Sequence, residues 1–476
     1  MANNKSYNPH ALIIPYPLQG HVIPAVHLAI KLASKGFTIT FVNTQFIHHQ
    51  ISKSQPDTTE DYDIFSVARK SGLDIHYHTV SDGMPLAFDR SLNHDEFMAS
   101  LLHVFWAHVD DLVQNIIAAE STPPLRCLIA DTFFVWPSSI AKKFNLVNVS
   151  FWTEPALVFT LYYHMNLLRK NGHFGFHDNR EDTIDYIPGV AGIEPKDLMS
   201  YLQATDTSTI VHKIIFKAFE DVKKADYVIG NTIEELEQDI ISALQVEKPF
   251  YSIGPIFPSG FTKSSVATSL WPESDCTNWL DTKPHGSVLY VSFGSYAHVS
   301  KNDLTEIAHG ILLSNVNFVW VLRPDIVSSD DAHPLPAGFT KECEGRGMVL
   351  PWCTQIEVLS HPAVGGFLTH CGWNSILESV WCGIPMLCFP LLTDQFTNRK
   401  LVTDDWNIGI GISDGKSIGR NKVSELISLV MNGKLGDEFR SRMKQVKKRL
   451  KDAMQEDGSS EKNLNKFINE ISKTCA

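Results

Sequence analysis

The sequence predicts an α/β protein of two doubly wound domains, each built on a parallel β-sheet. Short apolar runs of strand length alternate with helical patterns along the chain, as in a succession of βαβ units. The alternation is interrupted over residues 255–272, where Pro, Gly, Ser and Thr dominate as they do in interdomain linkers. The length of 476 residues fits two domains of ordinary size.

The first domain is expected at residues 1–254. Its first strand, Ala11–Tyr16, leads through a turn containing Gly20 into a helix at Val22–Lys35. The helix at Trp136–Phe144 lies between two of the later strands, and the further strands of this domain are expected at Phe37–Asn43, Cys127–Ala130, Val147–Phe151, Tyr227–Gly230 and Phe250–Ile253.

The second domain is expected at residues 273–455, beyond the linker at 255–272, with a terminal helical segment at 456–476. Its apolar runs predict strands at Ser287–Phe293, Asn317–Leu322, Met348–Pro351, Gly366–Thr369 and Pro385–Pro390. The chain ends in a charged amphipathic helix that includes Glu461–Ser472.

Composition and charge exclude several classes of protein. A hydrophobic content of 43% with 20% charged residues is typical of a globular protein, and a net charge of −12 argues against a nucleic-acid or anionic-membrane partner. The eight Cys form no C-x-x-C pair, so neither a zinc site nor a disulfide framework is indicated. A polar start and the lack of an apolar run of ~18–20 residues predict no secretory signal or membrane span, and hence a cytoplasmic protein.

The segment from Trp352 to Gln395 has features that suit a nucleotide sugar. A helix is expected to open at His370–Ser375 and to end near Gly383, and a helix start offers N–H donors and a positive dipole end to a phosphate. His370, Asn374 and Glu378 are four residues apart and would share one helix face. The imidazole and amide could donate to phosphate, and the carboxylate could accept from a ribose diol. Taken singly, each residue also fits a solvated helix face.

Further polar and aromatic residues flank this helix. Trp352 and Gln355 could give a nucleobase a flat stacking partner and an amide. Asp394 and Gln395 follow a buried strand, and ligands of open α/β sheets bind beyond the carboxyl ends of the strands.

The first domain carries a second chemical signal. His21 follows the first strand, and histidine is the natural general base near neutral pH. Asp131 follows the buried run Cys127–Ala130, where a carboxylate could orient and charge-balance an imidazole. The alternatives, that His21 lines the helix start and that Asp131 is an N-cap, remain open on these patterns alone.

The segment Trp352–Gln395 resembles the signature box of plant secondary-product glycosyltransferases, the UDP-dependent family-1 enzymes. It has the full length of that box and its residues at nearly all marked positions; Cys353 stands where the family often has Ala. The resemblance covers essentially the whole chain, most strongly Gly254–Gly411. It implies the GT-B fold, in which two Rossmann-like domains face each other across a cleft. It also implies that the terminal helix, 456–476, returns to the N-terminal domain.

The same resemblance implies roles for individual residues. His21 would be the catalytic base and Asp131 its partner. Ser295, which could also be an ordinary strand terminator, would lie near the phosphate, and Thr153 would touch the donor sugar. Within the box, the implied contacts are uracil for Trp352 and, through its backbone, Cys353; uridine for Gln355; ribose for Glu378; pyrophosphate for His370, Asn374 and Ser375; and sugar for Trp373, Asp394 and Gln395.

These roles imply an inverting transfer. His21 would take the proton of an acceptor hydroxyl while that oxygen attacks C1 of the sugar, which gives a β-glycoside from an α-linked donor. Gln395 suggests UDP-glucose rather than another UDP-sugar. No cofactor, metal or partner protein is expected, and the chain would act as a monomer.

The first domain also predicts a lipophilic acceptor such as a flavonoid, terpenoid or phenol. It is rich in apolar residues at expected loops, which suit such a partner but could equally be core: Phe88, Phe133, Phe134, Trp152, Phe159 and Met199. A UDP-sugar epimerase or hydrolase of the same architecture is disfavoured by this apolar set. A non-transferring binding protein is disfavoured by the presence of both His21 and Asp131.

Overall fold

The computed structural model describes residues 9–55, 63–119, 123–258, 261, 268–327, 334–413 and 418–475. The first eight residues and residues 259, 260 and 262–267 of the predicted linker therefore lie outside the described residues. The chain forms two compact units. Unit 1 comprises Met1–Ile193, Ala204–Leu270 and Ala453–Ala476, and unit 2 comprises Glu194–Gln203 and Trp271–Asp452.

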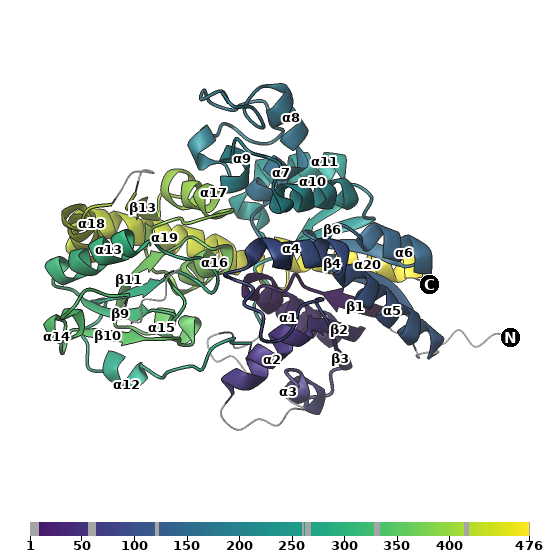
Figure 1. The fold of residues 1–476 in the computed structure, drawn as a ribbon, viewed down its shortest axis with the longest axis horizontal. Helices are drawn as coiled ribbons and strands as arrows, with labels where there is room; N and C mark the ends of the chain where they lie inside the picture. The colour runs from purple at the N-terminus through teal and green to yellow at the C-terminus, as the bar shows by residue number, and fades with distance from the viewer. Residues whose placement is uncertain are drawn as a thin grey trace. The chain divides into compact units, whose positions relative to one another are not determined.

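Unit 1 contains a parallel sheet with the order β3-β2-β1-β4-β5-β6-β7 (Figure 1). Because the chain builds outward from β1 in one direction and from β4 in the other, the topological switch point lies between these two strands. The strands are β1 (His10–Ile14), β2 (Thr38–Thr44), β3 (Ile75–Val80), β4 (Leu125–Asp131), β5 (Val147–Trp152), β6 (Tyr227–Gly230) and β7 (Phe250–Ser252).

Unit 2 contains a second parallel sheet with the order β10-β9-β8-β11-β12-β13. Its switch point lies between β8 and β11 for the same reason. The strands are β8 (Val288–Ser292), β9 (Asn317–Val321), β10 (Gly347–Leu350), β11 (Val364–Thr369), β12 (Met386–Cys388) and β13 (Gly409–Gly411). Two parallel α/β sheets confirm the predicted fold class.

Helices connect the strands in both units. Those of unit 1 are α1 (Gln19–Ser34), α2 (Gln45–Ser54), α3 (Ser66–Lys70), α4 (His94–His103), α5 (Phe105–Ala118), α6 (Pro137–Phe144), α7 (Ala156–Tyr163), α8 (Met165–Lys170), α10 (Ile210–Val222), α11 (Gln238–Glu247) and α20 (Ser459–Cys475). Those of unit 2 include α9 (Ser200–Gln203), α12 (Thr277–Leu280), α13 (Lys301–Ser314), α14 (Phe339–Glu342), α15 (Gln355–Ser360), α16 (Trp373–Cys382), α17 (Gln395–Lys400) and α18 (Arg420–Asn432), and α19 (Lys434–Ala453) leads to the end of this unit.

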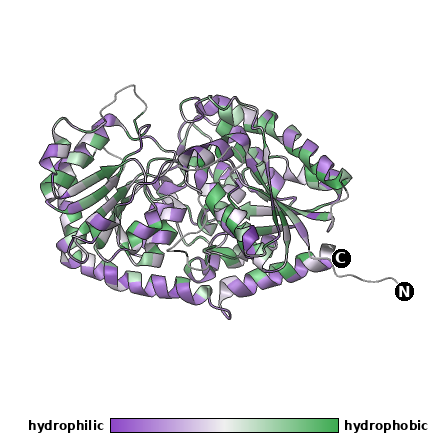
Figure 2. Cartoon of the chain, turned by 90° about the horizontal axis from the view of Figure 1, so that it is seen from below, coloured by the Kyte–Doolittle hydropathy of each residue, from purple (hydrophilic) through white to green (hydrophobic). Residues whose placement is uncertain are grey.

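The sheet of unit 1 is buried on both faces. Alternate residues of β1 point to opposite sides, so Ala11 and Ile13 join one hydrophobic cluster with α1, whereas Leu12 and Ile14 join another with α4 and α5. Strands covered on both faces are apolar throughout rather than alternating, which is why their sequence runs are so clear. Figure 2 shows the strands of each sheet coloured mainly as hydrophobic.

Two strands were missed by the sequence prediction, and both are sheet edges. β3 carries the sequence IHYHTV, in which the four middle residues are exposed or half-buried, and β13 has three residues, two of them Gly. An edge strand has a neighbour on one side and need not be apolar on both faces. It therefore lacks the continuous apolar run that marks a central strand.

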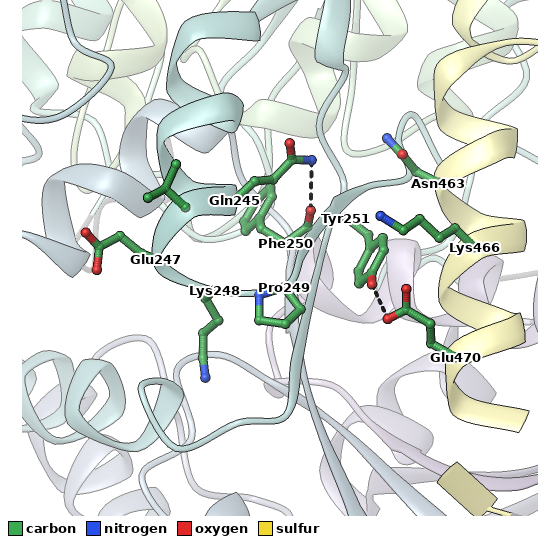
Figure 3. A pocket seen from close by; sticks show the side chains of 10 residues that line it. Gln245, Glu247, Lys248, Pro249, Phe250, Tyr251, Asn463, Lys466 and Glu470 are labelled. Carbon is green, nitrogen blue, oxygen red and sulfur yellow. Dashed lines mark hydrogen bonds between the residues drawn. The ribbon is translucent and has the colours of Figure 1, made fainter. Parts of the chain in front are cut away.

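The C-terminal helix α20 packs within unit 1. Leu464, Phe467 and Ile471 repeat at helical spacing and enter the same hydrophobic cluster as α1. Beside it, at the amino end of edge strand β7, a hollow of about 450 Å³ is lined by α11, β7 and α20 (Figure 3). There the hydroxyl of Tyr251 donates to Glu470 at 2.5 Å. The hollow lies at the end of β7 opposite to the carboxyl ends where α/β sheets bind ligands.

One internal segment departs from the predicted domain division. Glu194–Gln203 lies inside the predicted first domain, residues 1–254, but belongs to unit 2. Met199, predicted as part of the acceptor half, is therefore a buried residue of unit 2. Within the described residues, no helix combines the length and the apolar character that crossing a bilayer would require.

Candidate active site

His21 and Asp131 meet at the switch point of unit 1. His21 lies in the first turn of α1, directly after β1, and Asp131 is the last residue of the neighbouring strand β4. The imidazole Nδ1 is 2.7 Å from the Asp131 Oδ2. The Asp131 side chain is buried and that of His21 is 12% exposed, so the pair has a protected carboxylate and a more accessible ring.

The geometry assigns a tautomer to His21. A carboxylate can only accept, so Nδ1 carries the proton and donates it to Asp131. Nε2 then holds the lone pair and can act as a general base. The Oγ1 of Thr153, just beyond β5, lies 3.0 Å from the same Nδ1. Thr153 thus contacts the His21–Asp131 pair itself, which the sequence did not predict.

Trp136 is the N-cap of α6, so the alternative of a helix N-cap is wrong for Asp131. Its Oδ1 accepts a hydrogen bond of 3.0 Å from the backbone N–H of Phe133 and so stabilises the turn after β4. The two carboxylate oxygens have different partners: Oδ1 accepts from the backbone, and Oδ2 accepts from His21. A carboxylate fixed by its own backbone orients the imidazole more rigidly than a mobile one.

Four of the six residues predicted to contact the acceptor are core residues. Phe134, Trp152 and Met199 are at most 2% exposed, as is Phe159, so in this structure they offer no surface to a ligand. Phe134 follows β4 and Trp152 ends β5, whereas Phe159 lies in α7 and Met199 directly precedes α9. Phe88 and Phe133 are half-buried, and the Phe133 ring centroid is 5.8 Å from that of His21.

In unit 2, the helix start lies two to three residues later than predicted. α16 begins at Trp373, with Gly372 as its N-cap, because Cys371 adopts a left-handed backbone with φ +67°. His370 therefore lies in the turn after β11 and does not share a helix face with Asn374. Asn374 and Glu378 are both on α16, as expected, and both are half-buried. Trp373 and Ser375 of the first turn are buried.

His370 is held between two glycines. A Cβ on Gly294 would lie 2.4 Å from the His370 Nε2, and one on Gly372 would lie 2.5 Å from it. The ring is thus close to the backbone of the turns that follow β8 and β11. Burial, with a further contribution from the cation of Arg323, lowers the pKa of His370 to about 4. The ring is neutral at physiological pH and can donate a single N–H to a ligand.

Arg323 is a member of this site that the sequence analysis missed. It follows β9, is 1% exposed, and is paired with Asp325 at 2.9 Å. Its guanidinium also donates to the carbonyls of Gly294 and Ala297, the latter at 2.8 Å, and so fixes the loop that carries the half-buried Ser295. The only sequence feature that could have indicated Arg323 is its position as a single Arg directly after the apolar run of β9.

Three box residues form a hydrogen-bond network. The Gln355 Nε2, at the start of α15, donates to the Glu378 Oε2 at 2.7 Å and to the Ser375 Oγ at 3.0 Å. Burial raises the pKa of Glu378 to about 7, although the bond from Gln355 opposes that rise. The residues expected to contact uridine, ribose and phosphate are therefore already joined to one another.

The aromatic residue expected to meet the base, Trp352, comes three residues before Gln355 of this network. Trp352 follows β10 and is half-buried, whereas Cys353 is 4% exposed. The Cys353 Sγ lies 3.7 Å from the hydroxyl of Tyr290 on β8. Its side chain thus points into the unit, and only its backbone could be offered to a base.

Asp394 and Gln395 follow β12 and begin α17. The Gln395 Oε1 accepts from the backbone N–H groups of Leu391 and Leu392 at 2.8 and 3.1 Å. Asn398, fully buried, donates both to Asp394 and, at 2.9 Å, to the carbonyl of Cys371. Asn398 thus joins the loop after β12 to the turn after β11. No local sequence pattern predicts this contact.

Comparison with known proteins identifies this arrangement. Residues 272–448 match the family model described as UDP-glucoronosyl and UDP-glucosyl transferase. Over 476 aligned residues, 99% of this chain and 96% of the relative, the chain is 62% identical to UDP-glycosyltransferase 86A1 of Arabidopsis thaliana. The chain belongs to the family-1 UDP-glycosyltransferases.

Further relatives of this UDP-glycosyltransferase are more distant. It is 36% identical to 7-deoxyloganetin glucosyltransferase of Gardenia jasminoides, with 96% of this chain and 97% of the relative covered. A solved UDP-glucosyltransferase of Polygonum tinctorium, capable of glucosylating indoxyl, is 30% identical, with a TM-score of 0.78 over 98% of this chain and 99% of that chain. The two parallel sheets described above are the GT-B fold of this family.

Proposed function

We propose that this glycosyltransferase transfers glucose from UDP-glucose to a hydroxyl group of a lipophilic small molecule, with inversion at C1 and a β-glucoside as product. The observation that carries the proposal is the His21–Asp131 pair, with Nδ1 and Oδ2 2.7 Å apart. It leaves Nε2 to take the acceptor proton as the acceptor oxygen attacks C1 and UDP departs. Asp131 stabilises the imidazolium that forms.

The donor diphosphate is assigned to the start of α16. Negative charge grows on the leaving phosphate during transfer, and a helix start with N–H groups already in place stabilises that charge without reorganisation. The neutral His370 adds a donor, and the buried cation of Arg323 favours anionic groups nearby. The proposed reaction uses these groups for the leaving diphosphate and includes neither a metal nor a cofactor.

Glucose is the proposed sugar. The Gln395 Oε1 is occupied by two backbone N–H groups, so its Nε2 remains to donate to a sugar hydroxyl, and the Asp394 carboxylate can accept from others. The names of the Gardenia and Polygonum relatives, both glucosyltransferases, support this assignment. A site built on hydroxyl hydrogen bonds discriminates against sugars that leave them unmatched.

A lipophilic acceptor is supported by the surroundings of His21. Tyr16 and Phe133 pack within 6 Å of its ring, at centroid distances of 5.7 and 5.8 Å, so an apolar molecule could place its hydroxyl at Nε2. The names of the same two relatives give 7-deoxyloganetin and indoxyl as the molecules that they glucosylate.

The test is a panel of hydroxylated acceptors incubated with UDP-glucose, UDP-galactose, UDP-xylose and UDP-glucuronate. Mass spectrometry would identify products, NMR would give the anomeric configuration, and UDP release would be measured with and without acceptor. The proposal expects acceptor-dependent UDP release and β-glucosides. Equal release without acceptor would show a hydrolase, and UDP binding with no turnover would show a binding protein. An α-linked product would overturn the inverting step.

A further inference from the structure

The segment Glu194–Gln203, called the strap below, is attached to the loop after β12 and to α17 in unit 2. It contains a turn of 3₁₀ helix, Pro195–Asp197, and the short helix α9. Leu198, Met199 and Leu202 are at most 1% exposed, so the strap is anchored by apolar burial. Because the flanking chain on both sides belongs to unit 1, this docking cannot be deduced from chain order.

The strap holds Thr393 by a reciprocal pair of hydrogen bonds. The Ser200 N–H donates to the Thr393 carbonyl at 3.0 Å, and the Thr393 N–H donates to the Ser200 Oγ at 2.9 Å. Thr393 has φ +55°, a left-handed conformation that is unfavourable for a β-branched residue. Such strain persists where the surroundings compensate for it, and Ser200 binds both backbone groups of the strained residue.

A second contact lies one helical turn further along. The carbonyl of Asp197 accepts from the Thr397 Oγ1 at 2.7 Å, and the Asp197 carboxylate forms an ion pair with Arg399. Asp197 is 3% exposed, so removing its charge would leave Arg399 without its counter-charge in a largely buried setting. Two strap residues therefore fix both Thr393, near the end of the loop that follows β12, and the body of α17.

Thr393 transmits this constraint to the residues assigned to the sugar. Its Oγ1 donates to the Asp394 Oδ1 at 2.7 Å, and Gln395 follows as the first residue of α17. We propose that Ser200 and Asp197 are positioning residues for the donor sugar, acting through Thr393 and α17 on Asp394 and Gln395. This inference rests on the proposed sugar contacts of those two residues.

The inference predicts an effect on the sugar and not on the nucleotide. Trp352, Gln355 and Glu378 come from the β10–α15 loop, from α15 and from α16, whereas the strap bonds run to Thr393 and α17. UDP lacks the donor sugar that Asp394 and Gln395 are proposed to contact. A loosened strap should therefore lower glucose transfer while UDP still binds.

The experiment compares Ser200→Ala, Asp197→Asn and the control Lys196→Ala in the full chain. Lys196 is an exposed neighbour of Asp197 in the same turn. Its truncation alters the strap but leaves the Ser200 and Asp197 side chains in place. Each variant would be measured for kcat and KM with UDP-glucose and UDP-galactose, for UDP affinity by calorimetry, and for melting temperature. Ser200→Thr, which keeps a hydroxyl, serves as the conservative variant.

In Ser200→Ala and Asp197→Asn we expect kcat/KM for UDP-glucose to fall about tenfold, the usual loss for one disrupted buried hydrogen bond or ion pair. UDP affinity should stay within about twofold of wild type, and the preference for glucose over galactose should narrow. Ser200→Thr should recover most of the activity, and Lys196→Ala should resemble wild type.

Several outcomes would overturn the strap inference. Unchanged transfer in both variants would do so, as would a parallel loss of UDP binding and transfer, which indicates a general structural role. If Ser200→Ala does not fold, Asp197→Asn decides by the same criteria. A wild-type protein that transfers no sugar from any donor would instead refute the proposed function, a result visible before any variant is made.

Discussion

Unit 1 and unit 2 have corresponding strand orders but carry different chemistry at the same place. β1 and β4 flank the switch point in unit 1, and β8 and β11 flank it in unit 2. In unit 1 the residues at these strand ends, His21 and Asp131, form an acid–base pair. In unit 2 the corresponding turns bring His370 against Gly294, with a helix start behind them.

The fold determines where the functional side chains gather, and the residues in the turns determine what those side chains can do chemically. Parallel strands end at one edge of a sheet, so the side chains that follow them converge whatever their identity. An imidazole that is hydrogen-bonded to a buried carboxylate is suited to accept a proton as a general base. A neutral imidazole between glycines, beside a helix start, is suited to bind an anion.

The two clusters also differ in how they are assembled. In unit 1 the three polar residues come from β4 and from the segments that follow β1 and β5, all neighbours in one sheet. In unit 2 the site needs additional ties: Arg323 to the loop after β8, Asn398 to the turn after β11, and the strap to the loop after β12. We therefore expect the second site to be more sensitive to substitutions outside it.

Removal of His21, the proposed general base, should have the largest effect. It would show whether unit 1 contributes to turnover without contributing to UDP binding. His21→Ala should lower turnover by ~10²- to 10⁴-fold, because general-base catalysis contributes that much. UDP affinity should remain near that of wild type, since the donor residues lie in unit 2. Steady-state kinetics and UDP calorimetry check both parts, and near-normal turnover would remove His21 from the mechanism.

Loss of Trp352, the residue predicted to stack on uracil, should weaken UDP binding, which His21→Ala should leave unchanged. Trp352→Ala should weaken UDP binding by ~5- to 150-fold if its ring stacks on uracil with the energy of an aromatic–base stack. Trp279→Ala, at a half-buried tryptophan elsewhere in unit 2, is the matched control and should bind UDP normally. Equal calorimetric affinities of the two variants would show that Trp352 is not the platform.

The glycine pair around His370 offers a sharper test of unit 2. Gly294→Ala should weaken UDP binding and lower stability by about 1–3 kcal/mol, the usual cost of overpacking, because the new Cβ would meet the imidazole 2.4 Å away. Gly286→Ala is the control: Gly286 also has a positive φ, +66°, but a Cβ there would meet nothing within 4 Å. Both variants lose stability through φ, and only Gly294→Ala should lose UDP affinity. Similar affinities would contradict the role given to His370.

The smallest effect concerns pH and Glu378. Its pKa of about 7 in the folded protein lies above the ordinary value of 4.5, so between these pH values the folded protein binds more protons than the unfolded chain. The contribution of Glu378 therefore makes wild-type stability fall as pH rises through that window, with the full loss present above pH 7.

Glu378→Gln removes this titration. Its melting temperature should exceed that of wild type by at least ~2 °C at pH 8, and the difference should disappear near pH 4.5. UDP affinity should fall in the variant and, in wild type, rise between pH 6 and pH 8, because an ionised carboxylate accepts better from a ribose diol. Calorimetry and thermal melts across this range test both, and a pH-independent difference in melting temperature would contradict the assigned pKa.

The sequence by itself determined the features that depend on local order. Central strands such as Tyr227–Gly230 could be read directly, because a strand buried on both faces is apolar throughout. His21, Asp131 and the box residues could be placed at strand ends by the same logic, and the resemblance of the box indicated the family.

Only the tertiary structure decided the contacts between distant segments. The left-handed Cys371 moved His370 off the helix, Arg323 and Asn398 became parts of the proposed donor site, and the strap joined unit 2. It also turned Phe134, Trp152 and Met199 from candidate ligand contacts into core. Hydrophobic periodicity records which side of an element is buried but not what it is buried against, and a hydrogen bond across 193 residues, as between Ser200 and Thr393, leaves no periodic trace in the chain.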